Sequence, residues 1–283
     1  FSSKLSFFND SLIMFEILYC LDENYNEQTI VSMFSLISKN NVDFNFHIIH
    51  ENPESFKKSL KSSSKNFDLT NVNIYKFNET NFTFPKVQNS HVSKATYYRL
   101  FISDYLPLDI EKIIYIDPDV FCLKNILNIS NKLFDSLINS EFEISVRTEH
   151  LINNSNKKRY DSIGVSDQYF NAGVMFIDFK KWNKNNLREK FVEKTAEIEE
   201  HILFWDQDVM NSYFNGKYLE LPVQLNQHPQ NFKNSYYFYK ENTSLLHFSG
   251  KNKPWTKKGK KYKNSKIYHE LYQEVFNKKI RYI

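Results

Sequence analysis

The sequence predicts an α/β fold, a single Rossmann-like nucleotide-binding domain with a mixed, mostly parallel sheet. Its first part alternates apolar strand patterns with helical patterns, in the βαβαβ order of a parallel nucleotide-binding half-domain. A later apolar run at 112–116 has no polar face, which is typical of a strand buried on both sides of a sheet. The 283 residues, 41% of them hydrophobic, are enough to bury such a core.

Each expected element follows from the spacing of its apolar residues. In the first half-domain these elements are strand 12–20, helix 29–37, strand 43–50, helix 53–65 and strand 72–77. Beyond it they are helix 94–105, a strand that begins at 112 and stops at Pro118, helix 131–138, strand 142–146, strand 170–179, helix 187–204, helix 206–213 and strand 245–248. Two segments predict no regular element: 150–168, expected to be a mobile loop, and 222–241. We therefore expect one domain over 1–250 and a basic, aromatic tail at 251–283 that completes the site.

Two carboxylates follow the apolar run at 112–116, with Pro118 between Asp117 and Asp119. Because proline cannot donate to a sheet ladder, the strand should end here. Both acids would then lie at the carboxyl end of a central strand, where open α/β sheets bind their ligands. Such oxygen ligands favour Mg²⁺ or Mn²⁺ shared with substrate phosphates. The same spacing recurs at 206–208, so the position at a strand end carries the prediction, and the spacing alone does not.

Phosphate binding must use charged side chains, because the sequence has neither a Gly-x-Gly-x-x-Gly loop nor a P-loop. A metal at Asp117 and Asp119 would supply part of that charge. His247 ends a predicted strand and is followed by Lys253, so the pair offers an imidazole ligand and a phosphate cation. Imidazole shifts the expected metal from Mg²⁺ towards Mn²⁺. A lone histidine that is simply hydrogen-bonded or exposed is the alternative at this stage.

Charge is unevenly distributed along the chain. Residues 251–283 hold 11 Lys and Arg against 2 Asp and Glu, a balance of +9, whereas the remaining residues hold 26 against 31, a balance of −5. A basic tail that also carries tyrosines suits an anionic membrane surface as its neighbour. A solvated lysine-rich terminus would have the same composition. A nucleic-acid partner is disfavoured, because the acidic body would repel it.

The two cysteines, Cys20 and Cys122, are too few for a disulfide framework, so we expect buried free thiols and a cytoplasmic location. No apolar run is long enough to span a membrane, and residues 1–8 lack the long apolar core of a signal peptide. Binding of the tail to an anionic surface would place the protein peripherally on the inner face of the plasma membrane.

Several motifs in one order resemble glycosyltransferase family 8, the group that holds glycogenin and bacterial lipooligosaccharide galactosyltransferases. The resemblance spans roughly residues 12–256. The motifs are Asp22-Glu23-Asn24-Tyr25, Thr96-Tyr97-Tyr98-Arg99-Leu100, Tyr115-Ile116-Asp117-Pro118-Asp119-Val120, Phe170-Asn171-Ala172-Gly173-Val174 with Trp182, Asp206-Gln207-Asp208-Val209-Met210-Asn211, and His247-Phe248-Ser249-Gly250-Lys251-Asn252-Lys253-Pro254-Trp255. Each motif is weak alone, and their collinear order carries the resemblance.

The resemblance implies a GT-A fold, a UDP-sugar donor, Mn²⁺ with Mg²⁺ as the alternative, and transfer with retention of anomeric configuration. The implied metal ligands are Asp117, Asp119 and His247. The residues implied to bind the UDP-sugar are Asp22, Asn24, Tyr25, Asp117, Asn171, Ala172, Gly250 and Lys253. The residues implied to act in catalysis are Arg99, Asp206, Gln207 and Lys253.

Gln207 stands where a retaining glycosidase would place its carboxylate nucleophile, and an amide is a poor nucleophile. We therefore expect attack on the sugar from the side of the leaving group, with a covalent step through Asp206 as the alternative. The sequence departs from the family where an Asp often contacts sugar or acceptor; here the run is 147–149, Arg-Thr-Glu. His91 lies where family members meet the acceptor.

The predicted function is transfer of glucose or galactose from UDP to a saccharide or glycolipid acceptor, such as cell-surface lipopolysaccharide. The alternative is a non-catalytic nucleotide-sugar or glycan binding module. A phosphatase of the haloacid dehalogenase type also carries Asp-x-Asp on a strand, but on its first strand. Here a βαβαβ unit precedes Asp117, which disfavours that class.

Overall fold

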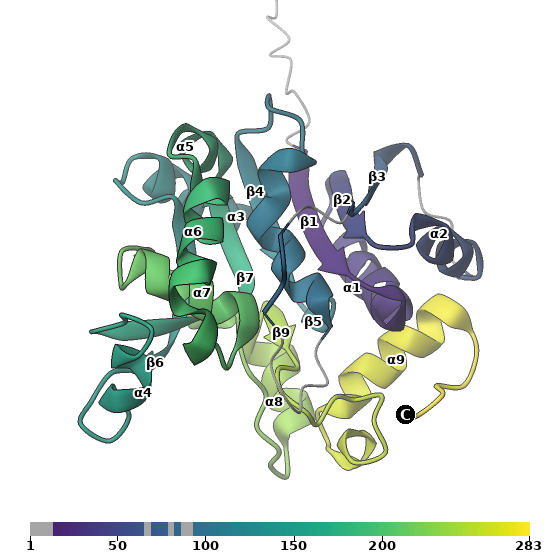
Figure 1. The fold of residues 1–283 in the computed structure, drawn as a ribbon. Helices are drawn as coiled ribbons and strands as arrows, with labels where there is room; N and C mark the ends of the chain where they lie inside the picture. Colours follow the sequence, from purple (N-terminus) through teal and green to yellow (C-terminus); the bar gives the residue numbers. More distant parts are fainter. Residues whose placement is uncertain (1–13, 65–68, 79–81, 86–92) are drawn as a thin grey trace, which may run out of the picture.

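The computed structural model describes residues 14–64, 69–78, 82–85 and 93–283. In these residues seven strands form one sheet in the order β3-β2-β1-β4-β7-β6-β8 (Figure 1). They are β1 (Phe15–Leu21), β2 (Phe44–His50), β3 (Val72–Lys76), β4 (Lys112–Ile116), β6 (Ile144–Leu151), β7 (Gln168–Asp178) and β8 (Leu219–Glu220). β7 runs antiparallel to β4 and β6, and the other neighbours are parallel, so the sheet is mixed and mostly parallel as predicted.

A second, two-stranded sheet joins β5 (Val120–Cys122) to β9 (Leu245–His247) in antiparallel pairing. Its register sets Val120 opposite His247. The turn before β5 is closed by a hydrogen bond from Val120 N to Asp117 O at 3.1 Å, with Pro118 at the position that favours proline in a β-turn. The Asp117–Val120 turn and the β5–β9 pairing therefore bring two segments distant in sequence to the end of β4.

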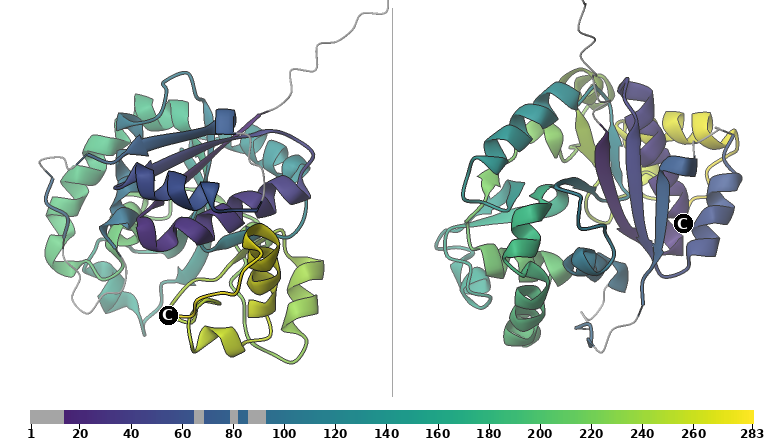
Figure 2. Two further views of the ribbon diagram at one scale, coloured as in Figure 1. Left: turned by 90° about the vertical axis from the view of Figure 1, so that its right-hand side faces the viewer. Right: turned by 90° about the horizontal axis from the view of Figure 1, so that it is seen from above.

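Helices cover both faces of the main sheet, as Figure 2 shows from two sides. Side chains alternate along β1, so that Ile17 and Tyr19 enter one core while Leu18 and Cys20 enter the other. The first core is covered by α1 (Asn26–Lys39), α2 (Pro53–Lys61), α3 (Leu127–Ile138), α8 (Ser235–Asn242) and α9 (Ser265–Phe276). The second is covered by the 3₁₀ helix Lys94–Asp104, α4 (Lys157–Asp161), α5 (Phe179–Lys184), α6 (Leu187–Ile198) and α7 (Trp205–Phe214).

Several predicted elements differ from the structure in their bounds; for example, the helix expected at 131–138 begins at Leu127 and the one expected at 53–65 ends at Lys61. Three differences are larger. The expected helix at 187–204 ends at Ile198, and a separate 3₁₀ turn, Glu199–His201, follows it. The expected loop at 150–168 is wrong, because β6 continues to Leu151 and α4 follows. The irregular segment at 222–241 is also wrong, because α8 forms there. α8 buries only Ser235 and Tyr239, so its apolar periodicity is too weak to indicate a helix.

The segment after residue 250 packs onto the first core and lies beside α1 (Figure 2). Trp255 and the α9 residues Tyr268, Tyr272 and Phe276 are buried there. Tyr272 Oη donates to Glu27 Oε2 at 2.7 Å, which ties α9 to the first turn of α1. Most of its aromatic side chains therefore stabilise the fold, and the boundary at residue 250 stays a prediction.

Two further expectations concern the cysteines and the membrane. Cys20 and Cys122 are both buried and free, as predicted. Among the described helices, none has the length and apolar character to cross a bilayer. His91 and the first residues of strand 12–20 lie outside the described residues.

Candidate active site

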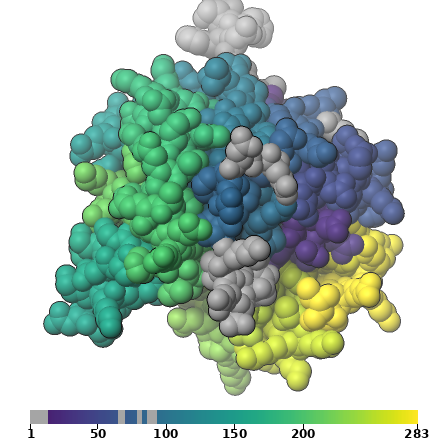
Figure 3. All heavy atoms as spheres, in the orientation of Figure 1, coloured from purple at the N-terminus to yellow at the C-terminus, as the bar shows by residue number. Residues whose placement is uncertain are grey.

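A cleft opens at the carboxyl ends of β1 and β4, between the helices of the second core and the C-terminal segment. In the space-filling view these two parts, in green and yellow, lie on opposite sides of the molecule's centre (Figure 3). The cleft holds about 900 Å³ of space free of protein atoms, its open mouth included. Eleven of the predicted site residues line it: Asp22, Tyr25, Arg99, Asp117, Asp119, Asn171, Asp206, Gln207, His247, Gly250 and Lys253. Asn24 and Ala172 do not line the cleft with them.

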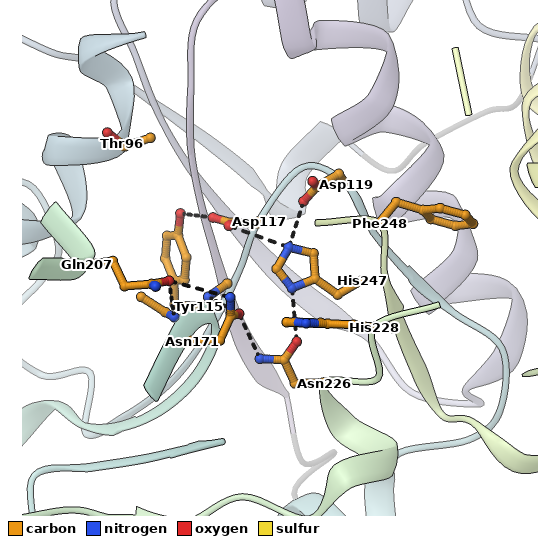
Figure 4. A network of polar contacts seen from close by, with 12 residues as sticks. Thr96, Tyr115, Asp117, Asp119, Asn171, Gln207, Asn226, His228, His247 and Phe248 are labelled. Carbon is orange, nitrogen blue, oxygen red and sulfur yellow. Dashed lines mark hydrogen bonds and ion pairs between the residues drawn. The ribbon is translucent and has the colours of Figure 1, made fainter. Parts of the chain in front are cut away.

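Asp117, Asp119 and His247 point towards one another at the inner end of the cleft (Figure 4). His247 Nε2 lies 3.3 Å from Asp119 Oδ1 and 4.0 Å from Asp117 Oδ2. One ligand atom from each of the three residues falls within 4.8 Å of the others. Two carboxylates and one imidazole form a donor set that suits Mn²⁺, and oxygen-preferring Mg²⁺ less well.

The orientation of His247 follows from a chain of hydrogen bonds that starts at a backbone N–H. Gly173 N donates to Asn171 Oδ1 at 3.0 Å, which fixes that atom as oxygen. Asn226 Nδ2 donates to the same oxygen at 3.0 Å, so Asn226 Oδ1 faces His247 Nδ1 at 2.9 Å. His247 Nδ1 must therefore carry the proton, and Nε2 presents its lone pair to the carboxylates.

Asp119 is buried next to two cationic or potentially cationic groups. Lys253 Nζ pairs with Asp119 Oδ2 and also donates to Phe248 O at 2.7 Å. Burial alone would raise the pKa of Asp119, but Lys253, and His247 when Nε2 is also protonated, hold that pKa below its usual range. Asp119 is therefore ionised at neutral pH, as a metal ligand must be.

Arg99 occupies the other half of the cleft and joins three elements. Its Nη1 donates to Ala172 O at 2.7 Å and to Asp117 Oδ1 at 3.2 Å, and its Nε lies 2.6 Å from Asp206 Oδ2. Burial raises the pKa of Asp206 to about 6, and the adjacent guanidinium opposes this by favouring the carboxylate. Asp206 is thus ionised at neutral pH and held by Arg99.

The Gln207 side chain is oriented by its neighbours. Its Oε1 accepts from Ala172 N at 3.0 Å and from Asn171 Nδ2 at 3.4 Å, while its Nε2 donates to Tyr169 Oη at 3.2 Å. A backbone donor thus fixes the amide oxygen against β7. Figure 4 shows Gln207 across the cleft from His247, on the side of Tyr115 and Asn171.

The remaining predicted residues lie on the side of Asp119 and Lys253. Asp22 Oδ1 accepts from Asn24 N at 2.9 Å and caps the turn after β1, and the Asn24 side chain also donates to Asp22. The Tyr25 ring packs edge-on against Trp255 at a centroid distance of 6.1 Å. Gly250 has φ +78°, a left-handed conformation that favours glycine.

Sequence reasoning missed several polar residues that support the site. Asn226 orients His247, and Arg147 Nη1 in turn donates to Asn226 O. Glu149 Oε2 lies 3.4 Å from Asn171 Nδ2, so the 147–149 run does reach the site. The His228 ring stands edge-on to His247 at 4.9 Å, and burial lowers the pKa of His228 to about 3. No periodic pattern marks Asn226 or His228, because both lie between β8 and β9 outside any helix or strand.

The mixed sheet has the GT-A fold, and the match to a glycosyltransferase family model shows that the protein is a glycosyltransferase. The chain belongs to glycosyltransferase family 8, because the model of that family, "Glycosyl transferase family 8", matches residues 16–259. This assignment agrees with the resemblance seen in the sequence motifs.

Individual relatives cover most of the chain. The lipopolysaccharide 1,2-glucosyltransferase of Escherichia coli (strain K12) is 29% identical over 256 residues, which are 85% of this chain and 72% of the relative. General stress protein A of Bacillus subtilis (strain 168) is 28% identical over 282 residues, which are 92% of this chain and 91% of the relative. A crystal structure of the galactosyltransferase LgtC with donor and acceptor sugar analogues has a TM-score of 0.74 at 21% identity, over 92% of this chain and 96% of that one. This last similarity concerns the fold.

Proposed function

We propose that the protein transfers glucose or galactose from a UDP-hexose to a saccharide or glycolipid acceptor, with retention of configuration and with Mn²⁺ as the cofactor. The observation that carries the proposal is the convergence of Asp117, Asp119 and His247 in one cleft with Lys253 and Gln207. The named relatives include a lipopolysaccharide glucosyltransferase, which supports cell-surface lipopolysaccharide as the acceptor class.

Asp117, Asp119 and His247 would hold the divalent metal. The fit rests on this donor set and on the tautomer of His247, whose Nε2 lone pair faces the two carboxylates. When bound, a divalent cation supplies positive charge next to the diphosphate of the donor. In this proposal the chain adds a second charge, because Lys253 lies beside Asp119 at the same end of the cleft.

The two ends of the cleft have different roles in this proposal. Asp22, Asn24 and Tyr25 bind uridine, and Gly250 and Lys253 contact the β-phosphate, with Lys253 neutralising the leaving UDP. Towards the other end, Arg99, Asn171, Ala172, Asp206 and Gln207 surround the hexose. Arg99 contacts Asp117 and Asp206, whereas Lys253 contacts Asp119, which supports placing the two groups at different ends.

The geometry favours attack from the side of the leaving group. Asp206 is buried and its Oδ2 lies 2.6 Å from Arg99 Nε, so the guanidinium neutralises its charge and its nucleophilicity is reduced. Gln207 is fixed through Ala172 N, so its side chain positions the sugar and stabilises positive charge as the bond to UDP breaks. A covalent intermediate through Asp206 is the competing mechanism. Trapping a glycosyl-enzyme in a Gln207→Glu variant would overturn the preference for attack from the side of the leaving group.

The basic C-terminal segment is proposed to bind an anionic membrane surface, which would place the protein peripherally on the inner face of the plasma membrane. Lys257, Lys258 and Lys260 are exposed in this segment, whereas Trp255 is buried. The attraction would therefore be electrostatic, at roughly 1 kcal/mol per lysine near the surface, and would weaken with salt. Co-sedimentation with anionic vesicles at low and high salt tests it, and equal binding to neutral vesicles would contradict it.

The test of the function is release of UDP from a panel of UDP-sugars without acceptor, with Mn²⁺, with Mg²⁺ and with EDTA. We expect slow, Mn²⁺-dependent release from UDP-glucose or UDP-galactose. In Asp119→Ala and His247→Ala the release should fall at least about 100-fold while the circular dichroism spectrum is retained. Mn²⁺-dependent binding of UDP without any release would favour the non-catalytic binding module.

A further inference from the structure

An exposed apolar segment adjoins the sugar end of the cleft. Leu203 and Phe204 keep 53% and 47% of their surface exposed, and Phe204 and Trp205 line the cleft immediately before Asp206 and Gln207. Large apolar side chains exposed next to a polar site lower solubility and add nothing to the core, so a ligand is the expected reason for them. Asp206 is only 1% exposed, so the two aromatic rings lie further towards solvent than the carboxylate that follows them.

The backbone of Trp205, which carries one of these rings, is in a strained conformation. Trp205 has φ +48°, in the left-handed region that bulky side chains rarely adopt. Such a residue costs about 1–3 kcal/mol of strain and persists where the surrounding structure enforces it. Strain of this kind gathers at functional sites, and here it falls one residue before Asp206.

Asp208 enforces the conformation. Its Oδ2 accepts from Leu203 N at 2.7 Å and from Phe204 N at 2.8 Å, and its Oδ1 accepts from Tyr169 Oη at 2.8 Å. Arg159 pairs with the same carboxylate, and its guanidinium lies 5.8 Å from the Phe204 ring centroid. Asp208 is fully buried, so its carboxylate acts on the backbone of the segment and not on a ligand.

We propose that Phe204 and Trp205 form the acceptor subsite, where a pyranose ring of the acceptor stacks on their aromatic faces. One face of a pyranose is lined by C–H groups, which carry partial positive charge and pack well against the negative face of an aromatic ring. The proposal rests on the proposed transferase function and extends it to the second substrate. In it, Asp208 is a positioning residue for the two rings.

The location distinguishes an acceptor from a donor. In the proposed function the uridine lies towards Asp22 and Tyr25, and the hexose lies at buried Arg99 and Asp206. The acceptor hydroxyl must reach the same sugar carbon from the open side of the cleft. The exposed ring of Phe204 and the partly buried ring of Trp205 line the cleft together with Gln207 and meet that requirement.

The experiment measures how saccharides accelerate UDP release from the UDP-hexose that the wild type hydrolyses fastest. The probes are lactose, maltose and the methyl glycosides of glucose and galactose. Phe204→Ala and Trp205→Ala are compared with Phe232→Ala, a control whose aromatic side chain is 42% exposed and which does not line the cleft. Thermal unfolding of each variant checks that it is folded.

We expect the half-saturating saccharide concentration to rise about tenfold in Phe204→Ala and Trp205→Ala. That rise should exceed any loss in acceptor-free UDP release at least fivefold, whereas Phe232→Ala should change neither quantity. An unchanged half-saturating concentration in Phe204→Ala and Trp205→Ala would overturn the proposed acceptor subsite. UDP release that no saccharide accelerates in the wild type would also overturn it, while absence of UDP release from every donor would instead overturn the proposed function.

Discussion

His247 Nδ1 lies 2.9 Å from Asn226 Oδ1, and this contact decides which imidazole nitrogen faces the two carboxylates. The amide orientation of Asn226 is set in turn by Asn171 Oδ1, which accepts from Gly173 N. A backbone N–H in β7 thus determines, through three hydrogen bonds, which nitrogen of a predicted metal ligand faces the carboxylates. Supporting contacts of this kind typically change metal affinity 10–100-fold.

Replacing Asn226 with alanine should therefore weaken Mn²⁺ affinity by roughly 10–100-fold, since His247 Nδ1 would lose its acceptor. Mn²⁺ affinity is measured by electron paramagnetic resonance of the free ion in the presence of UDP. Asn242→Ala removes an exposed asparagine that does not line the cleft and serves as the control, with the affinity of the wild type. Equal affinity in both variants and the wild type would show that the contact does not orient the ligand.

Gly173 should tolerate no side chain. A Cβ at this position would overlap the His247 ring and lie 2.9 Å from Asp117 Oδ2. Gly173→Ala must therefore separate two of the three predicted ligands, and we expect at least a tenfold loss of Mn²⁺ affinity in the same assay, with about 1–3 kcal/mol of destabilisation from overpacking.

Gly216→Ala is the control for that variant. Gly216 has φ +80°, so alanine there strains the backbone, but its Cβ would meet no atom closer than 3.5 Å. It should lose about 1 kcal/mol of stability and keep its Mn²⁺ affinity. If Gly173→Ala loses no more affinity than Gly216→Ala, the close approach at Gly173 has no role in the site.

The parts of the site that could be predicted are those in which local sequence fixes position. Asp117 ends an apolar run at a proline, so its place at a strand end follows from the residues alone. Asn226 could not be found in this way. It reaches His247 because Gln227 bridges to Leu246 of β9, and the segment around Gln227 has no apolar periodicity that would indicate this pairing.

The same distinction applies to the fold, in which local sequence predicted single elements but did not predict their long-range packing. The strand that begins at Lys112 was predicted to stop at Pro118, and the observed β4 ends at Ile116. Its burial follows from its apolar run. The packing of α9 on α1 was not predicted, because a high lysine content obscured the buried tyrosines at 268 and 272. The net charge of a segment describes its composition, whereas burial depends on which residues share a helix face. The charge of residues 251–283 therefore did not indicate that one face of α9 is buried.

Arg99 should matter for stability as well as for the reaction. Arg99→Met would leave Asp206 buried without its counterion, which costs about 3–5 kcal/mol. Urea unfolding should show that loss, and adding Asp206→Asn should recover at least half of it without restoring UDP release. Arg188→Met, which breaks a partly exposed pair with Asp104, should cost less than about 1 kcal/mol. Similar losses in Arg99→Met and Arg188→Met would contradict the buried ion pair.

We expect His50 to lower the free energy of unfolding at acidic pH. Asn52 N donates to its Nδ1 at 2.8 Å and its Nε2 lies 2.8 Å from Asn26 Oδ1, an arrangement that only neutral histidine can satisfy. Burial accordingly lowers the pKa of His50 to about 4. Below its ordinary pKa of about 6.5 the unfolded chain takes up a proton that the folded protein excludes until about pH 4. The contribution of His50 to stability is therefore intact above pH 6.5 and is lost as the pH falls.

From pH 7 to pH 5 this group should remove roughly 1–2 kcal/mol from the free energy of unfolding. Urea unfolding at both pH values measures the change in the wild type, in His50→Gln and in His201→Gln, whose histidine is exposed. His50→Gln should be less stable at pH 7 yet lose less on acidification, because glutamine does not titrate. His201→Gln should follow the wild type, and a pH response of His50→Gln as steep as that of the wild type would assign the acid limb to other groups.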